Sequence, residues 1–191
     1  MARRMLDENF HRYPEVLDAI RAGAAGFRPA LEPVLETTSR VLDFDQELAI
    51  EAVFYVGALE TNAFTAVVNG RYLVNLPLDG GVDRCPFLVA HELTHLLHAK
   101  LSNSPGGWVR SIATSVMEEG LAIWTSKAVF PGFTDSQYTA WQKPEWLDQC
   151  RGADRAILAG IRPHLAESSN EALMHFLFGP GPGGLDREAY Y

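Results

Sequence analysis

His91-Glu92-Leu93-Thr94-His95 is the stretch of this chain that says most about its fold and its chemistry. Side chains four residues apart on a helix share one face, with Cβ atoms about 5–6 Å apart. Two imidazoles at this spacing can bind one zinc ion at Zn–N distances of about 2.0–2.1 Å. Glu92 is rotated by about 100° from His91. Its carboxylate therefore stands beside the metal, where it can take a proton from the attacking water.

The neighbouring residues predict a buried helix over residues 86–101. The apolar stripe opposite the histidines consists of Val89, Leu93, Leu96 and Leu97. Such a stripe packs on a core and turns the opposite face toward a cleft. His98 shares the His91 face, but a rise of about 1.5 Å per residue separates the two by about 10 Å along the axis. We therefore expect His98 to be a cleft or surface residue and not a third ligand. A pair of surface histidines without a metal is the alternative interpretation of the pentapeptide.

The third ligand has to come from elsewhere, because catalytic zinc sites use three protein ligands and keep one position open. The candidate segment is Met117-Glu118-Glu119-Gly120-Leu121-Ala122, in a helix expected over residues 108–130. The apolar stripe that Glu119 joins contains Trp108, Ile112, Val116, Ile123 and Phe130. A carboxylate on a buried face needs a compensating partner, and a metal supplies one. Glu119 is the predicted ligand, and pairing with Arg or Lys at the core edge is the alternative.

Glu118 lies about 100° around the same helix from Glu119. Two positions are open for it. It either accepts a hydrogen bond from the N–H of a ligand, as partners of metal ligands commonly do, or it is exposed to solvent.

HELTH followed by Glu118-Glu119-Gly120-Leu121-Ala122 resembles the gluzincin group of zinc metalloproteases. The likeness is closest to uncharacterised bacterial proteins described as predicted zinc-dependent proteases, and it covers residues 53–124. The resemblance implies one zinc ion held by His91, His95 and Glu119, with Glu92 as general base. It also implies that an edge strand within residues 61–68 binds extended peptide. The residues expected to line this contact are Asn62, Ala63, Phe64 and Thr65. No exopeptidase signature of the Gly-x-Met-Glu-Asn type is present.

The resemblance also implies a donor for the oxyanion that forms during peptide hydrolysis. Arg187-Glu188-Ala189-Tyr190-Tyr191 is similar to the start of a C-terminal segment in this group, so Tyr190 or Tyr191 is a candidate. Packing or fraying of a terminal tyrosine is the alternative. His164 and His175 are expected to be ordinary helix residues. Because the group continues beyond this point, one interpretation is that the chain is incomplete at its C-terminus.

The remaining patterns predict an α+β fold of zincin type in one domain, residues 1–191. Helices are expected over residues 8–21, broken at the Gly23–Gly26 stretch, and over residues 28–42. Residues 48–56 are apolar and β-branched, which indicates a strand. Asn69-Gly70 between residues 63–68 and 71–76 is a strong hairpin signal. A small, partly antiparallel sheet should therefore lie beside the active-site helix and precede a helical C-terminal half.

Composition narrows the class of protein. The 191 residues carry a net charge of -8, which argues against nucleic acid as the main partner. Cys85 and Cys150 are far apart and form no CxxC pair, which favours a reducing compartment. Neither a signal peptide nor an apolar run of about 20 residues is present, so we expect a cytoplasmic protein without membrane contact.

The predicted function is hydrolysis of peptide bonds in a peptide or protein substrate, with one zinc ion as cofactor. The sequence does not indicate an oligomeric state. One alternative is a zinc-binding module of zincin fold without hydrolytic activity, although such a protein has no need of Glu92. Another is a helical interaction protein without a metal.

Overall fold

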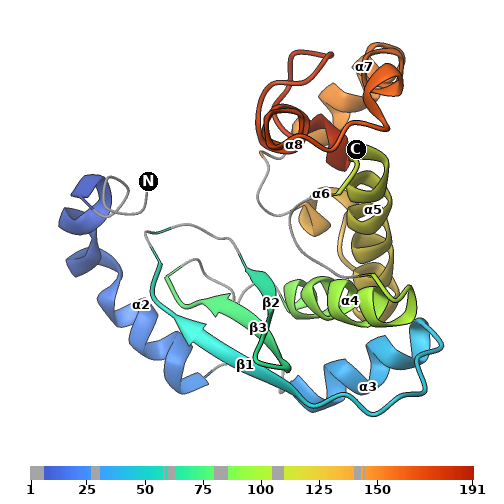
Figure 1. Cartoon of the computed structure of the whole chain (residues 1–191). Helices are drawn as coiled ribbons and strands as arrows, with labels where there is room; N and C mark the ends of the chain where they lie inside the picture. The colour runs from blue at the N-terminus through green and yellow to red at the C-terminus, as the bar shows by residue number, and fades with distance from the viewer. Residues whose placement is uncertain are drawn as a thin grey trace.

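The computed structural model of the chain has an α+β fold, with a small mixed sheet followed by a helical C-terminal half (Figure 1). It describes residues 7–26, 31–57, 59, 63–79, 86–104, 110–139, 143 and 145–191. Asn62, Cys85 and Trp108, which the sequence analysis singled out, lie outside these ranges. No helix in the described ranges is long and apolar enough to cross a lipid bilayer.

The sheet has three strands, β1 (Ile50–Tyr55), β2 (Phe64–Val68) and β3 (Arg71–Pro77), in the order β1-β3-β2. β2 pairs with β3 in antiparallel fashion and β1 pairs with β3 in parallel. Between β2 and β3, Asn69 and Gly70 have φ values of 52° and 77°, which is the left-handed backbone that a two-residue hairpin requires. The predicted hairpin is therefore confirmed.

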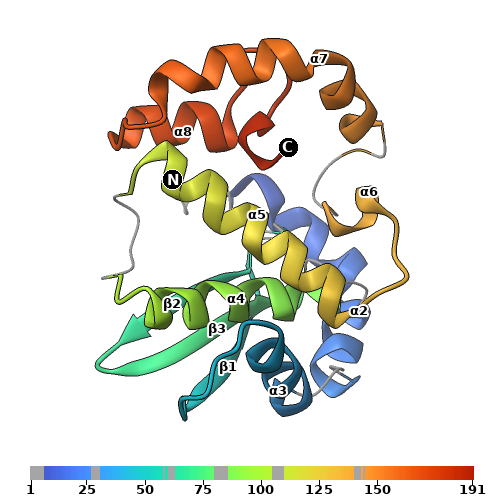
Figure 2. The ribbon, with the colours of Figure 1, turned by 90° about the vertical axis from the view of Figure 1, so that its right-hand side faces the viewer.

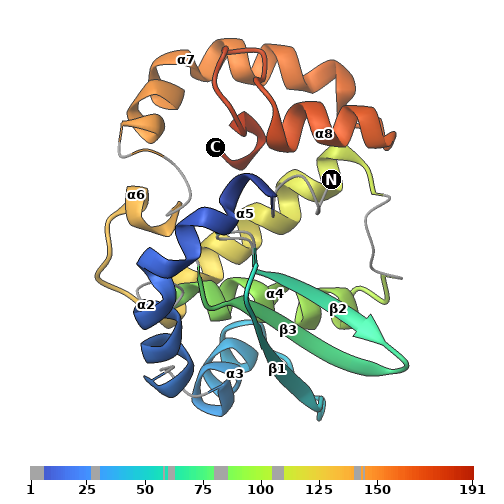
Figure 3. The same cartoon turned by 90° about the vertical axis from the view of Figure 1, so that its left-hand side faces the viewer.

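One face of the sheet packs against α4 (Phe87–Leu101), the helix that carries the HELTH sequence. Val74 and Leu76 of β3 are fully buried there against Val89 and Leu93. Viewed with the sheet in front, α4 lies directly behind it, while α3 (Leu31–Val41) packs on α4 and α5 (Figure 3). The apolar stripe predicted for α4 is thus the face that holds this helix in the core.

α5 (Ile112–Val129) packs along the other side of α4, so that α4 is sandwiched between the sheet and α5 (Figure 2). The Ser111 side chain caps the start of α5 by accepting a hydrogen bond from the Thr114 amide at 3.1 Å. Ser126 Oγ donates to the Phe87 carbonyl at 3.1 Å and so ties α5 to the first turn of α4. These contacts fix how the two helices face each other.

The C-terminal half adds α6 (Asp135–Tyr138), α7 (Trp146–Ile161) and α8 (Asn170–Phe178), with 3₁₀ turns η3 (Arg162–His164) and η4 (Glu188–Tyr190). The buried Glu188 carboxylate accepts hydrogen bonds from the amides of Gly183 at 2.7 Å and Leu185 at 2.6 Å. Trp146 Nε1 of α7 donates to the Asp186 carbonyl at 2.8 Å. Together these bonds hold η4 against α5, α7 and α8.

The N-terminal helix was predicted too short. η1 (Phe10–Arg12) leads into α2 (Tyr13–Gly26), which continues through the glycines expected to break it. A glycine inside a helix costs only about 1 kcal/mol relative to alanine. At Gly23 the helix comes close to the sheet, because an added Cβ would lie 3.8 Å from the Leu78 carbonyl oxygen. Pro14 lies in the first turn of α2, where a missing backbone N–H leaves no helical hydrogen bond unmade.

Candidate metal centre

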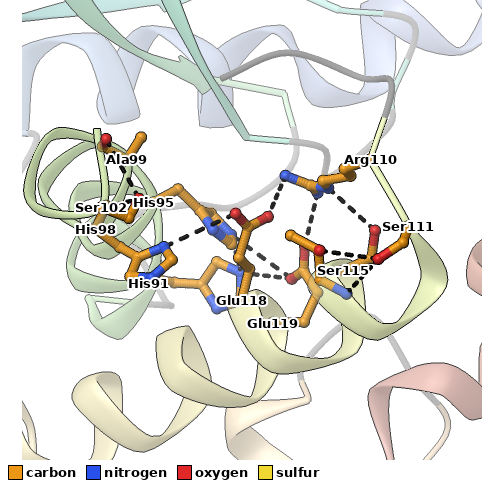
Figure 4. Close-up of polar contacts among 11 residues, drawn as sticks. His91, His95, His98, Ala99, Ser102, Arg110, Ser111, Ser115, Glu118 and Glu119 are labelled. Atoms are coloured by element: carbon orange, nitrogen blue, oxygen red, sulfur yellow. Dashed lines mark hydrogen bonds and ion pairs between the residues drawn. The ribbon is translucent and has the colours of Figure 1, made fainter. Parts of the chain in front are cut away.

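His91 and His95 project from one face of α4 toward α5 (Figure 4). Their ring centroids are 4.9 Å apart and their Nε2 atoms are 3.2 Å apart. His91 is 6% exposed, and the side chain of His95 is 16% exposed. The packing of α4 between the sheet and α5 therefore holds both imidazoles at one largely buried position.

Glu119 reaches the same position from α5. Its Oε2 atom lies 3.1 Å from His91 Nε2 and 3.6 Å from His95 Nε2. On the same stripe of the helix, Ile112 is buried and Val116 is partly buried against the same cluster, which explains why the carboxylate faces inward. His91, His95 and Glu119 thus form a group that could hold one metal ion.

Protons alone cannot satisfy this triangle of atoms. A neutral imidazole carries one N–H, and an ionised carboxylate only accepts hydrogen bonds. Glu119 Oε2 needs an N–H from each histidine, but two such N–H groups would then face each other across the 3.2 Å between the Nε2 atoms. If only one of the two Nε2 atoms carries a proton, at least one pair of neighbouring atoms in the triangle has lone pairs pointing at each other with no hydrogen between them. A cation at the centre would satisfy all three atoms at once.

The dimensions of the triangle also suit zinc. For bonds of about 2.0–2.1 Å in a tetrahedral site, neighbouring ligand atoms are about 3.3–3.4 Å apart. The three edges observed here are 3.1, 3.2 and 3.6 Å. Two imidazole nitrogens and one carboxylate oxygen are a ligand set that zinc commonly takes. The residues present therefore fit one zinc ion with a fourth position left over.

Glu119 is ionised in this setting. Burial by itself raises its pKa, but the contacts with the His91 and His95 rings outweigh burial and hold the pKa well below its usual range. Ionisation is the state in which a carboxylate binds a metal.

Glu92 lies beside the triangle on α4 and is 6% exposed. Burial raises the pKa of its carboxyl to about 7, with His91 opposing the rise and Glu119 adding to it. A carboxyl group with a pKa near neutrality can both accept and return a proton. The sequence placed Glu92 next to the two histidines, and the structure gives it this environment.

The surroundings of Glu118 differ from both alternatives predicted for it, a hydrogen bond from a metal ligand and exposure to solvent. It is 7% exposed, so it is not a solvated side chain. Its Oε2 atom lies 2.6 Å from Arg110 Nη1, and its Oε1 atom lies 3.8 Å from His98 Nδ1. The Arg110 contact is an ion pair by distance without hydrogen-bond geometry at Oε2. Glu118 therefore pairs with an arginine instead of accepting from a predicted ligand.

Arg110 is the residue of this site that the sequence analysis missed. Its guanidinium contacts Glu118 and lies 3.6 Å from Glu119 Oε1 (Figure 4). The signal was indirect, since two adjacent acids on a helix that is largely buried require a nearby cation. Both alternatives predicted for Glu119 are therefore present together. One of its oxygens lies beside the histidines, where a metal could bind, and the other faces an arginine.

Tyr190 lies close enough to the site to interact with its charges. Burial raises the pKa of its phenol; Glu119 adds to the rise, Arg187 and Arg110 oppose it, and Glu92 adds further. The hydroxyl therefore stays protonated and can act as a hydrogen-bond donor. Tyr191 is 45% exposed. Of the two candidate donors, Tyr190 is the more enclosed, since it is partly buried against the cluster that contains Ile112.

The described residues that were expected to contact peptide do not all lie on the same face of the sheet. Ala63 packs against the main core, and Thr65 lies on β2 opposite Val74, on the face toward α4. Phe64 is opposite Asn75 on the other face of the sheet, 49% exposed and in edge contact with Tyr55. In the described part of the chain, β2 pairs only with β3, which leaves its other edge unpaired.

The remaining histidines have partners of their own. His164 is partly exposed and pairs with Glu167 at 2.6 Å. His175 is in ring contact with Phe176. Neither is among the described residues that could form a metal-binding group.

Comparison with protein-family models, curated proteins and solved structures gives no match to this chain. The functional conclusion therefore depends on the geometry of the site itself.

Proposed function

We propose that this chain is a zinc-dependent hydrolase that cleaves peptide bonds in a peptide or protein substrate. The observation that carries the proposal is the triangle of His91 Nε2, His95 Nε2 and Glu119 Oε2, with edges of 3.1 to 3.6 Å. Three protein ligands with a vacant fourth position are typical of catalytic zinc sites, whereas structural sites are closed by four. The gluzincin likeness of HELTH and Glu118–Ala122 supports the same conclusion.

In this proposal His91, His95 and Glu119 would hold a zinc ion, which when bound would supply Lewis-acid chemistry toward the substrate carbonyl and the attacking water. Glu92 accepts the proton of the attacking water and later returns it to the leaving amine. Its pKa of about 7, raised by burial, suits both transfers near neutral pH. The Tyr190 hydroxyl donates a hydrogen bond to the oxyanion that develops on the carbonyl oxygen.

Substrate would bind in an extended conformation along the unpaired edge of β2. Backbone groups of an edge strand can pair with any peptide, which gives affinity without strict sequence recognition. Thr65 lies on the face of β2 toward α4, so a peptide added to this edge would lie alongside the helix that carries His91 and His95. Asn62, Ala63 and Phe64 complete the segment proposed to make this contact.

A zinc-binding module without hydrolytic activity would use the same three ligands. It would have no use for a buried carboxyl group beside them, and Glu92 is 6% exposed at that place. Burying an ionisable group costs free energy unless a function or a partner compensates for it. The hydrolase is therefore the better supported function.

Glu92→Gln distinguishes the two functions. We expect the variant to keep one equivalent of zinc, measured by elemental analysis, because Glu92 is not a corner of the triangle. Hydrolysis of an unstructured protein such as casein should fall to background, because an amide cannot accept the proton. Zinc retention together with unchanged turnover would reject Glu92 as the base. A wild-type protein that binds zinc and hydrolyses no peptide or protein substrate would favour the binding module.

A further inference from the structure

Arg110 lies just before the N-cap of α5, and its side chain runs along the helix to residues about two turns later. Nε donates a hydrogen bond to Ser115 Oγ at 3.1 Å. Nη1 lies 2.6 Å from Glu118 Oε2, and Nη2 lies 3.6 Å from Glu119 Oε1 (Figure 4). The guanidinium is thus held on three sides, and one of them is the predicted metal ligand.

The two oxygens of Glu119 have different neighbours. Oε2 faces the histidine nitrogens at 3.1 and 3.6 Å, while Oε1 faces Arg110. A carboxylate with two free oxygens can bind a metal through both, and the second oxygen would then occupy the position that a catalytic zinc keeps open for water. Whether Oε1 also binds the metal therefore decides how many coordination positions remain open to water and substrate.

We propose that Arg110 is a positioning residue of the metal centre, one that holds Glu119 Oε1 so that Glu119 binds the metal through Oε2 alone. This inference rests on the proposed metal site. It gives Glu118 a function as well, since Glu118 and Ser115 fix the guanidinium from the other two sides. Glu118 thereby acts on the metal site through Arg110 and not by contact with a ligand.

Arginine is the residue type that this task requires. Its donors form a rigid planar fork that can face two carboxylates at once, whereas lysine presents a single mobile ammonium group. Both carboxylates are 7% exposed. Among the described residues, Arg110 is the one Arg or Lys within ion-pair distance of either. Within the described ranges, no second arginine or lysine is therefore in place to take over its contact with Oε1.

The first measurement is zinc affinity, by competition with a chelating dye. Groups that hydrogen bond a metal ligand typically contribute 10- to 100-fold to metal affinity. Arg110 contacts Glu119 Oε1 as an ion pair at 3.6 Å, so we expect Arg110→Ala to weaken zinc binding by about the lower of these factors, roughly tenfold. Arg110→Lys should recover only part of the loss. Arg155→Ala, which removes an exposed arginine of α7, is the matched control and should bind zinc like the wild type.

The second measurement reads the coordination directly. Cobalt(II) in place of zinc gives visible absorption bands whose intensity falls as the coordination number rises. If Glu119 binds through both oxygens once Arg110 is gone, the bands of Arg110→Ala should weaken. Added guanidinium ion should restore them, because it can occupy the space of the missing side chain. A purely structural role for Arg110 would lower stability without either spectral effect.

The outcomes separate this inference from the proposed function. A wild-type protein that binds no zinc would overturn both. One equivalent of zinc in the wild type, with unchanged affinity and cobalt bands in Arg110→Ala, would overturn the positioning role and leave the metal site standing. If Arg110→Ala does not fold, Arg110→Gln keeps a donor for Ser115 and allows the same comparison. Failure of both variants to fold would assign Arg110 a structural role instead.

Discussion

Replacing Glu118 and Glu119 in turn with alanine probes the candidate site most sharply. The two residues are neighbours on α5, and each is 7% exposed, so the two substitutions remove the same group from equally buried positions. Only Glu119 has an oxygen in the triangle with the histidine nitrogens, at 3.1 and 3.6 Å. Any difference in metal binding between the variants therefore reports that geometry and not burial.

The expected loss can be worked from the number of ligands. Structural zinc sites bind with about 10–16 kcal/mol, which over four ligands is about 2.5–4 kcal/mol for each. At about 1.4 kcal/mol per tenfold, Glu119→Ala should weaken zinc binding by roughly 10²- to 10³-fold. Glu118 contacts Arg110 and His98 and neither of the ligand histidines, so Glu118→Ala should lose less than about tenfold in zinc affinity.

Zinc affinity of the purified proteins would be measured by chelator competition, with zinc content by elemental analysis. Circular dichroism melts of the metal-free proteins would show that both variants fold. Equal losses in the two variants, or a larger loss in Glu118→Ala, would refute the assignment of Glu119 as a ligand. Either result would also show that the close approach of Glu119 Oε2 to His91 and His95 reflects hydrogen bonding alone.

Three further predictions concern the framework around the site. Gly183→Ala should lower the free energy of unfolding by about 1–3 kcal/mol in urea titrations, because its Cβ would lie 2.6 Å from Glu188 Oε1. Gly152→Ala on α7, with open space around the new Cβ, should instead raise it by up to about 1 kcal/mol. The Cys150 thiol, whose pKa is raised to about 11 by burial and by Glu188, should resist alkylation at neutral pH until the protein unfolds, as peptide mapping would show. Leu93→Ala, at a fully buried position on the apolar stripe of α4, should lower the free energy of unfolding by about 2–5 kcal/mol. Leu158→Ala, at a position that is 62% exposed, should lower it by less than about 0.5 kcal/mol.

Local patterns predicted the parts of the fold that local physics determines. Asn69-Gly70 specified the hairpin, because few other pairs tolerate the backbone of its two-residue turn. The apolar stripe specified which face of α4 packs against the sheet, and so the direction in which His91 and His95 point, although the histidine side of the helix is largely buried as well. Glu119 was predicted in the same way, since an acid on an apolar stripe has to meet a partner. The histidines and this acid do come together in the structure.

Non-local pairings were beyond the reach of the sequence. The parallel pairing of β1 with β3 joins segments separated by the β2 strand, and no turn residue encodes it. Arg110 was missed because its position on the chain, before the N-cap of α5, says nothing of how far its long side chain reaches. Glu118 was misplaced for the same reason, since its surroundings depend on Arg110.

The charges of the site explain why two acids stand side by side on α5. One guanidinium cannot neutralise two buried carboxylates, and the nearby histidines cannot share protons in a way that satisfies the triangle they form with Glu119. A divalent cation at that triangle would leave Arg110 to Glu118 and to the far oxygen of Glu119. Glu119 would then be neutralised mainly by the metal ion, and Glu118 mainly by Arg110. An ion-pair cluster alone thus leaves one carboxylate charge without a matching cation, whereas His91, His95 and Glu119 form a group that could hold a metal ion, and such an ion would account for both carboxylates.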